Sequence, residues 1–185
     1  MLTKTSSGSE LLLRGAKSYL DALAAIAAFK GEVQKACSAV YDQHRAELTA
    51  QLGLEDAEWK PHESDSVEER WAEVGVLRTA GTGGTFYLYL WWGETEDSEA
   101  SITARVCLAL YGKRLRDEIY EEFRGRNRRC RIETSRTDTF ELNLETPIKP
   151  EEIGSAAEVL DTLMREWLGY CKSVGGLKLK KRQTG

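Results

Sequence analysis

The sequence predicts an α+β domain in which helices pack on one face of a mostly antiparallel sheet of about five strands. Three observations lead to this prediction: alternating side chains in the middle third of the chain, a long helical pattern before them and a shorter one after them. The alternation is clearest between Ile102 and Leu110, where the even positions are apolar. A period of two indicates one buried and one solvated sheet face. Such a sheet needs helices on its apolar side.

Residues 1–52 are predicted to be a long helical segment. Gly31 is its weak point, since glycine costs about 1 kcal/mol relative to alanine, so the pattern leaves open one long helix or two shorter ones folded on the sheet. A single helix of this length would extend past a small domain, and the same stripe of a second copy would cover it, so a homodimer is expected. Apolar residues recur at steps of three and four at Leu12, Ala16, Tyr19, Leu20, Leu23, Ala27, Val33, Cys37, Val40, Tyr41, Leu48 and Leu52.

Residues 53–69 are predicted to be an acidic linker, because they contain Pro61 and few apolar side chains. The α+β domain is predicted over residues 70–174. A glycine-rich turn joins its first two strands and lacks the Gly-Lys-Ser or Gly-Lys-Thr ending of a phosphate loop, so it is interpreted as a hairpin tip. The first three strands are expected at about residues 71–79, 85–92 and 101–111.

The second half of the predicted domain contains two helices and a hairpin. Residues 113–125 have the spacing of a short amphipathic helix that ends at glycine. Two strands are expected near residues 129–134 and 139–144. The last helix begins near Pro150 and carries a well-formed apolar stripe, and residues 175–185 form a basic tail. The predicted order is therefore helix, three strands, helix, two strands, helix.

Composition places the chain among soluble globular proteins, with 41% hydrophobic and 30% charged residues. No apolar run is long enough to span a bilayer, so no membrane association is expected. The N-terminus does not have the pattern of a signal peptide. The four cysteines lie apart without a Cys-x-x-Cys pair, which favours reduced thiols and a cytoplasmic location.

Charge is unevenly distributed along a chain whose net charge is −4. Residues 55–73 contain eight acidic side chains, and residues 113–131 contain eight basic ones. Guanidinium groups in the second segment can bind phosphates or an acidic protein surface. In the competing interpretation they belong to a solvated turn and pair with acidic loops. The candidate binding residues are Arg124, Arg126, Arg128, Arg129 and Arg131.

Aromatic residues occupy both faces of the second predicted strand. Tyr87, Tyr89 and Trp91 share the face opposite the expected core, where they could stack nucleic-acid bases or hold a peptide. In the competing interpretation the N-terminal helix or a partner subunit covers this face, because large apolar patches are rarely left in water.

The sequence predicts no catalytic residue, metal site or cofactor. His44 and His62 are the only histidines, and neither has a cysteine or a second histidine at the spacing of metal ligands. The acidic turn at residues 94–99 lacks the glycine and the spacing of a calcium loop.

These observations favour a non-enzymatic cytoplasmic interaction protein that binds another protein through a charge-polarised surface, such as an inhibitor, immunity protein, adaptor or regulatory subunit. One alternative is a nucleic-acid-associated protein that uses the basic segment and the aromatic strand face. A second alternative is a hydrolase whose catalytic residues the sequence does not identify.

Overall fold

A computed structural model describes residues 5–52, 59–66, 71–80, 84–94, 100–111, 131–134 and 139–173. The chain divides into two compact units, residues 1–32 and residues 33–185, which are described separately. The elements are α1 (Thr5–Leu52), β1 (Lys60–Ser66), β2 (Trp71–Ala80), β3 (Gly84–Glu94), β4 (Ala100–Tyr111), β5 (Arg131–Thr134), β6 (Thr139–Ile148), the 3-10 helix η1 (Pro150–Ser155) and α3 (Ala156–Ser173).

The strands form one antiparallel sheet in the order β1-β2-β3-β4-β6-β5, which confirms the predicted α+β class. The sheet has six strands, whereas the sequence predicted about five. The additional strand, β1, lies inside the segment predicted to be a linker. It pairs with β2 along its whole length, from Lys60 opposite Leu77 to Ser66 opposite Trp71. β1 is an edge strand that pairs through backbone hydrogen bonds. Its side chains are almost all polar, so the sequence shows no apolar alternation there.

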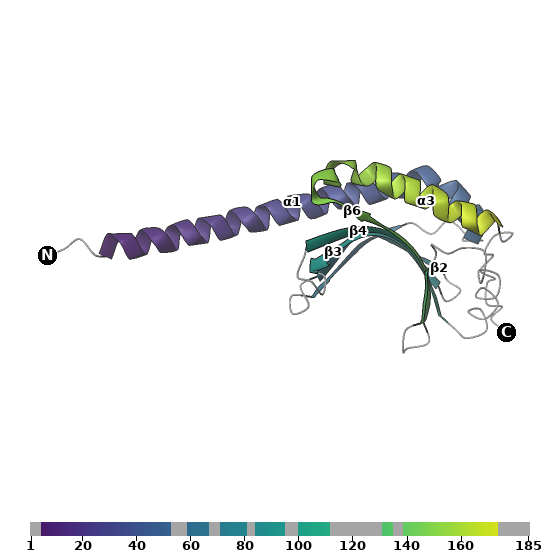
Figure 1. Ribbon diagram of the computed structural model, residues 1–185, viewed down its shortest axis with the longest axis horizontal. Helices are drawn as coiled ribbons and strands as arrows, with labels where there is room; N and C mark the ends of the chain where they lie inside the picture. The colour runs from purple at the N-terminus through teal and green to yellow at the C-terminus, as the bar shows by residue number, and fades with distance from the viewer. Residues whose placement is uncertain are drawn as a thin grey trace. The chain divides into compact units, whose positions relative to one another are not determined.

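The core of residues 33–185 lies between the sheet and two helices. The second half of α1, from Val33, and α3 lie on the same side of the sheet, which curves away from them (Figure 1). The ring of Trp167 in α3 meets that of Phe86 in β3 edge to face, with centroids 5.4 Å apart. The fully buried strand residues on this face include Val74, Val76, Phe86, Leu88, Leu90, Val106, Leu108, Leu110, Leu142 and Leu144.

The structure has a single helix over Thr5–Leu52, so the alternative of two shorter helices is not observed. In its second half, a buried arginine connects the helix to the sheet. Nη1 of Arg78, in β2, donates hydrogen bonds to Tyr41 Oη and Thr49 Oγ1, each at 3.0 Å. Arg78 occupies a position on the apolar face of β2 and is fully buried. Tyr41 is therefore both a core aromatic residue and a hydrogen-bond acceptor.

A polar contact joins the second half of α1 to α3. Asp161 Oδ1 lies 2.6 Å from His44 Nε2 and accepts a hydrogen bond from Gln43 Nε2 at 3.3 Å. Asp161 also pairs with Arg165 one turn further along α3. The hydrogen bond to His44 lowers the pKa of Asp161, and Arg165 lowers it further against the opposing effect of burial. This carboxylate is therefore stabilised in its charged form between the two helices.

The last predicted helix begins with a 3-10 turn at Pro150 and continues as α3 from Ala156. The predicted helix over residues 113–125 lies outside the described residues, as does the predicted basic tail. Among the parts that the structure describes, no helix combines the length and apolar character needed to cross a membrane. Cys37, Cys107 and Cys171 are buried free thiols.

Candidate functional site

The predicted aromatic row lies on the sheet face opposite the two helices of residues 33–185. Tyr89 is buried, with 6% of its surface exposed, and the half-buried Tyr87 and Trp91 pack with it against Cys107 and Ala109. The sequence therefore placed these three aromatic residues correctly on one face. The second half of α1 packs on the other face, so it does not provide the cover considered for this row.

Five residues that are paired in register form a row across this sheet face. His62, Gly75, Tyr89, Arg105 and Glu145 lie opposite one another in successive strands from β1 to β6. The missing side chain of Gly75 leaves room for the His62 ring, which meets the Tyr89 ring at a centroid distance of 5.7 Å. A Cβ at Gly75 would lie 2.1 Å from the backbone oxygen of Leu88, so only glycine fits here. The sequence alone does not reveal this row, because the strand register had to be known.

Carboxylates accompany the aromatic side chains on this face. His62 Nε2 lies 3.1 Å from Glu73 Oε2, and Arg105 Nε donates to Glu145 Oε2 at 2.9 Å. Burial raises the pKa of the Tyr89 phenol, and the nearby Cys107 thiol and Glu73 carboxylate raise it further. Tyr89 therefore stays neutral. A nucleic-acid base could not stack on the buried Tyr89 ring. This geometry gives the nucleic-acid alternative no support at the aromatic row.

Asn143 is a further buried polar residue on the same face. It is 2% exposed, and its Nδ2 donates to Glu141 Oε2 at 3.3 Å. Its Oδ1 has no hydrogen-bond partner among the atoms that the structure describes. Asn143 faces Cys107 in β4 and Arg131 in β5. The face is thus a mixture of buried aromatic and polar groups rather than a second apolar core.

The predicted basic binding residues fall almost entirely beyond the described ranges. Arg124, Arg126, Arg128 and Arg129 lie outside them. Arg131 is the first residue of β5, and its side chain is not among those described. Their role in binding stays a prediction.

An exposed apolar stripe lies on the first half of α1. We label α1 with positions a to g of a seven-residue repeat, starting with Leu12 at d. Positions a, d and e of the second half hold the buried Val33, Cys37, Val40, Tyr41 and Leu48. The same positions of the first half hold side chains that are 43–77% exposed. We name this set the apolar stripe: Leu12, Leu13, Tyr19, Leu20, Leu23 and Ile26.

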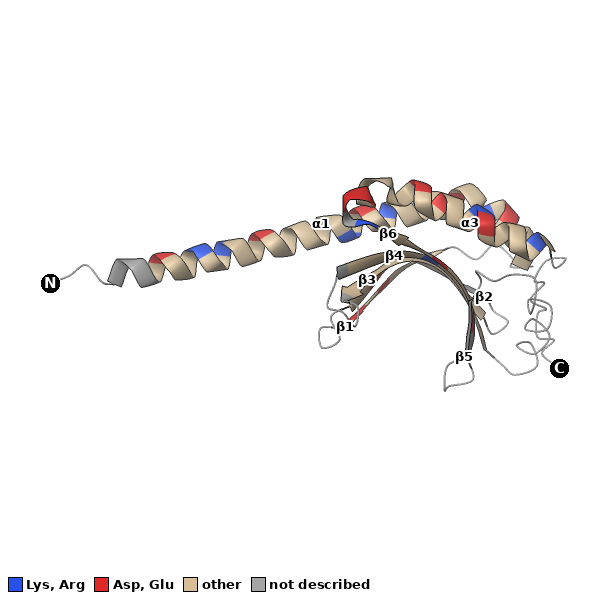
Figure 2. Ribbon diagram, in the orientation of Figure 1, with Lys and Arg blue, Asp and Glu red and all other residues tan. Residues whose placement is uncertain are grey.

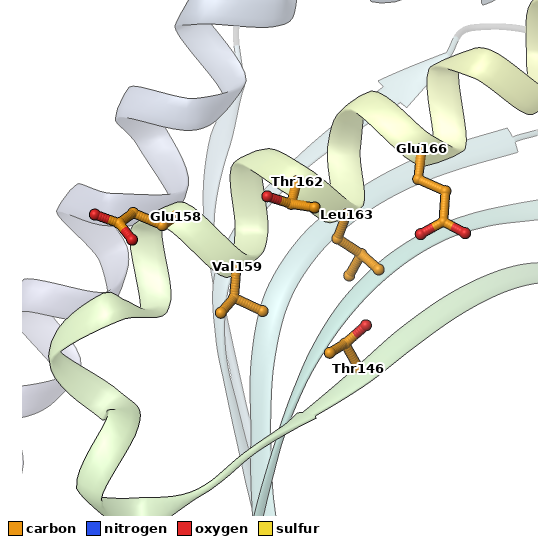
Figure 3. A pocket seen from close by; sticks show the side chains of 6 residues that line it. All are labelled: Thr146, Glu158, Val159, Thr162, Leu163 and Glu166. Carbon is orange, nitrogen blue, oxygen red and sulfur yellow. The ribbon is translucent and has the colours of Figure 1, made fainter.

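A shallow groove of about 410 Å³ runs between α3 and β6 (Figure 3). Val159 and Leu163 give it an apolar side, and Glu158 and Glu166 add two carboxylates. Tyr170 Oη donates a hydrogen bond to Glu166 Oε1 at 2.9 Å and holds that carboxylate in place. Thr146 of β6 and Thr162 of α3 complete the lining.

No group of three or more His, Cys, Asp or Glu side chains suited to a metal ion occurs in the described ranges. Comparisons of this chain with protein-family models, with curated proteins and with solved structures find no match.

Proposed function

We propose that this protein is a non-enzymatic interaction protein that binds another protein chain through the apolar stripe of α1. The observation that carries the proposal is the exposure of this stripe, from 43% at Leu23 to 77% at Leu12. Exposed apolar surfaces that are contiguous and bounded by polar residues mark interaction sites in soluble proteins. Amphipathic helices of this kind bind partners with anchors at steps of three, four and seven residues.

Physical considerations about helices support the same conclusion. Most of the stability of a protein helix comes from packing its apolar face, because isolated helices are marginal in water. In the second half of α1 the sheet and α3 provide that packing. The first half has an equivalent set of apolar side chains but no such cover among the described residues. A partner protein would supply it.

A charge placed inside the stripe tests this proposal. We expect Leu23→Glu to remove binding, because the complex would bury an unpaired carboxylate. Ala28→Glu adds the same charge at position f on the opposite side of the helix and is the matched control. Each full-length variant is expressed in cells, and its sedimentation coefficient is measured in the cell extract and after purification.

The expected result is that wild-type protein and Ala28→Glu sediment faster than a single chain, while Leu23→Glu sediments as one. Circular dichroism checks that both variants retain the wild-type helix and sheet content. Sedimentation of wild-type protein as a single chain in both the extract and the purified sample would contradict the proposal.

A further inference from the structure

We infer that the partner of the apolar stripe is a second copy of this chain, which pairs in parallel so that Leu20 of each helix lies against Gly15 of the other. This inference rests on the proposed function and names the partner at the same site. It follows from the continuity of the seven-residue repeat, the placement of the charges and the surroundings of Gly15.

The repeat of the first half is that of a helix-pairing surface. Leu12, Tyr19 and Ile26 occupy successive d positions, and Ala16 and Leu23 occupy the a positions between them. Apolar a and d positions that recur every 3.5 residues form the seam between two paired helices. Lys30 occupies the next a position. The d and a positions that follow it along α1 are Val33, Cys37 and Val40, which are buried. The pattern that is covered in the second half is therefore the one left exposed in the first.

The charges of residues 10–28 lie away from this seam, whereas Lys30 occupies the a position that follows Leu23. Figure 2 shows isolated charged positions along this part of α1. In the sequence the charges of residues 10–28 are Glu10, Arg14, Lys17 and Asp21. In the repeat they fall at positions b and f, on the outer side of the helix. Two acidic and two basic residues balance, so two copies would not repel each other. Charges at e and g select particular partners in paired helices, and the e and g positions of residues 12–28 carry none.

The third observation concerns Gly15. It lies inside the helix, where glycine is unfavourable relative to alanine, and a Cβ added to it would meet nothing within 4 Å. No contact among the described residues therefore requires glycine at this position. A close approach by a second helix would require it, because the absence of a side chain lets a large residue pack against the backbone.

A parallel pair places a large side chain opposite Gly15. In that arrangement position g of one helix faces position e of the other, five residues further along. Gly15 then faces Leu20. Ala22 faces Ala27 in the next repeat. The flanks of the stripe are thus complementary in size at Gly15, where the glycine of one chain meets a leucine of the other.

The test measures the mass of the purified full-length protein by sedimentation equilibrium between about 1 and 100 μM. We expect twice the chain mass of 20.8 kDa at the upper concentrations. Gly15→Leu should weaken the association at least tenfold, because two leucines would then compete for one space. Ala28→Leu adds a leucine at position f and is the matched control, with no expected change in the dissociation constant.

A double variant that exchanges the small and the large side chain is the sharper test. Gly15→Leu combined with Leu20→Ala restores a large residue opposite a small one, so we expect it to recover most of the association lost in Gly15→Leu.

Leu12→Cys tests the orientation of the pair. Two d positions meet in a parallel pair, so mild oxidation should join two chains of this variant by a disulfide. Wild-type protein under the same conditions should stay unlinked.

The possible results separate this inference from the proposed function. A purified wild-type protein that stays monomeric at 100 μM overturns the second copy as partner, whereas a Leu23-dependent complex in the extract would still support binding to a different protein. Equal dissociation constants for Gly15→Leu and Ala28→Leu would exclude the contact with Gly15. Cross-linking of Leu12→Cys only to a Leu23→Cys chain, which joins a d position to an a position, would show antiparallel pairing and overturn the parallel arrangement.

Discussion

The first and second halves of α1 carry one apolar repeat in two different environments. In the second half Cys37, Tyr41 and Leu48 are fully buried, and Tyr41 also accepts a hydrogen bond from Arg78. In the first half Tyr19 and Leu20 are more than 60% exposed. The comparison teaches that an apolar repeat specifies a helix face but not what covers it. In the second half the cover comes from the same chain, and in the first half we propose that it comes from another.

The largest expected difference between the halves concerns leucine truncation. Leu48→Ala should lower the free energy of unfolding by about 2–5 kcal/mol, because it leaves a cavity under a fully buried side chain. Leu20→Ala, in the first half, should change the free energy by less than about 0.5 kcal/mol in protein dilute enough to be monomeric. Urea denaturation followed by circular dichroism measures both. Equal losses would mean that the first half is packed within its own chain.

Removal of a tyrosine phenol oxygen compares the polar contacts of the two halves of α1. Tyr41→Phe removes an acceptor of Arg78 and should cost about 1.5–3 kcal/mol, since hydrogen bonds to charged groups are the stronger ones. Tyr19→Phe is the matched control in the exposed half, and we expect it to leave the unfolding midpoint unchanged. A wild-type midpoint for Tyr41→Phe would show that the contact contributes little to stability.

Glycine replacement gives a smaller effect of opposite sign. A Cβ at Gly31 would meet nothing within 4 Å, so Gly31→Ala should increase the stability of α1 by about 0.5–1 kcal/mol. Gly15→Ala should stabilise the monomeric helix similarly but weaken association. Thermal unfolding by circular dichroism and sedimentation equilibrium separate the two results. Tighter association of Gly15→Ala would argue against a close helix contact there.

The smallest expected effect is a pH dependence of the contact between the second half of α1 and α3. His44 and Arg165 lower the pKa of Asp161 below its ordinary value of about 3.9. Its stabilising contribution is therefore complete above pH 5 and is lost as the pH falls through the lowered pKa. Asp161→Asn should flatten this part of the stability profile, as measured by urea denaturation at pH 2.5–6. An unchanged acid slope would assign the dependence to other carboxylates.

The sheet was predictable because its signal is local. The alternation in β4 identifies a strand and the face that packs on the core without knowledge of its neighbours. By contrast, β1 was missed because the side chains on its half-buried face are polar, so they give no apolar alternation. The same reasoning explains Arg78, whose type predicts exposure and whose burial depends on acceptors that lie 29 and 37 residues earlier in the chain.

For the candidate sites, the sequence identified the aromatic row but not its surroundings. Tyr87, Tyr89 and Trp91 alternate in one strand, so their common face could be predicted. The carboxylates beside them come from other strands, and the space for His62 depends on Gly75 in the neighbouring strand. Cross-strand neighbours are set by register, which a single strand does not encode.

The sequence by itself determined the periodicities: which residues form α1, which form the central strands, and which side of each is apolar. Those properties follow from side-chain order along a regular backbone. Only the tertiary structure decided that the apolar repeat of α1 is buried in the second half of the helix and exposed in the first. It also decided that a buried arginine and a polar contact at Asp161 hold the second half in place. Burial depends on segments distant in sequence that meet in space, and no local pattern contains that information.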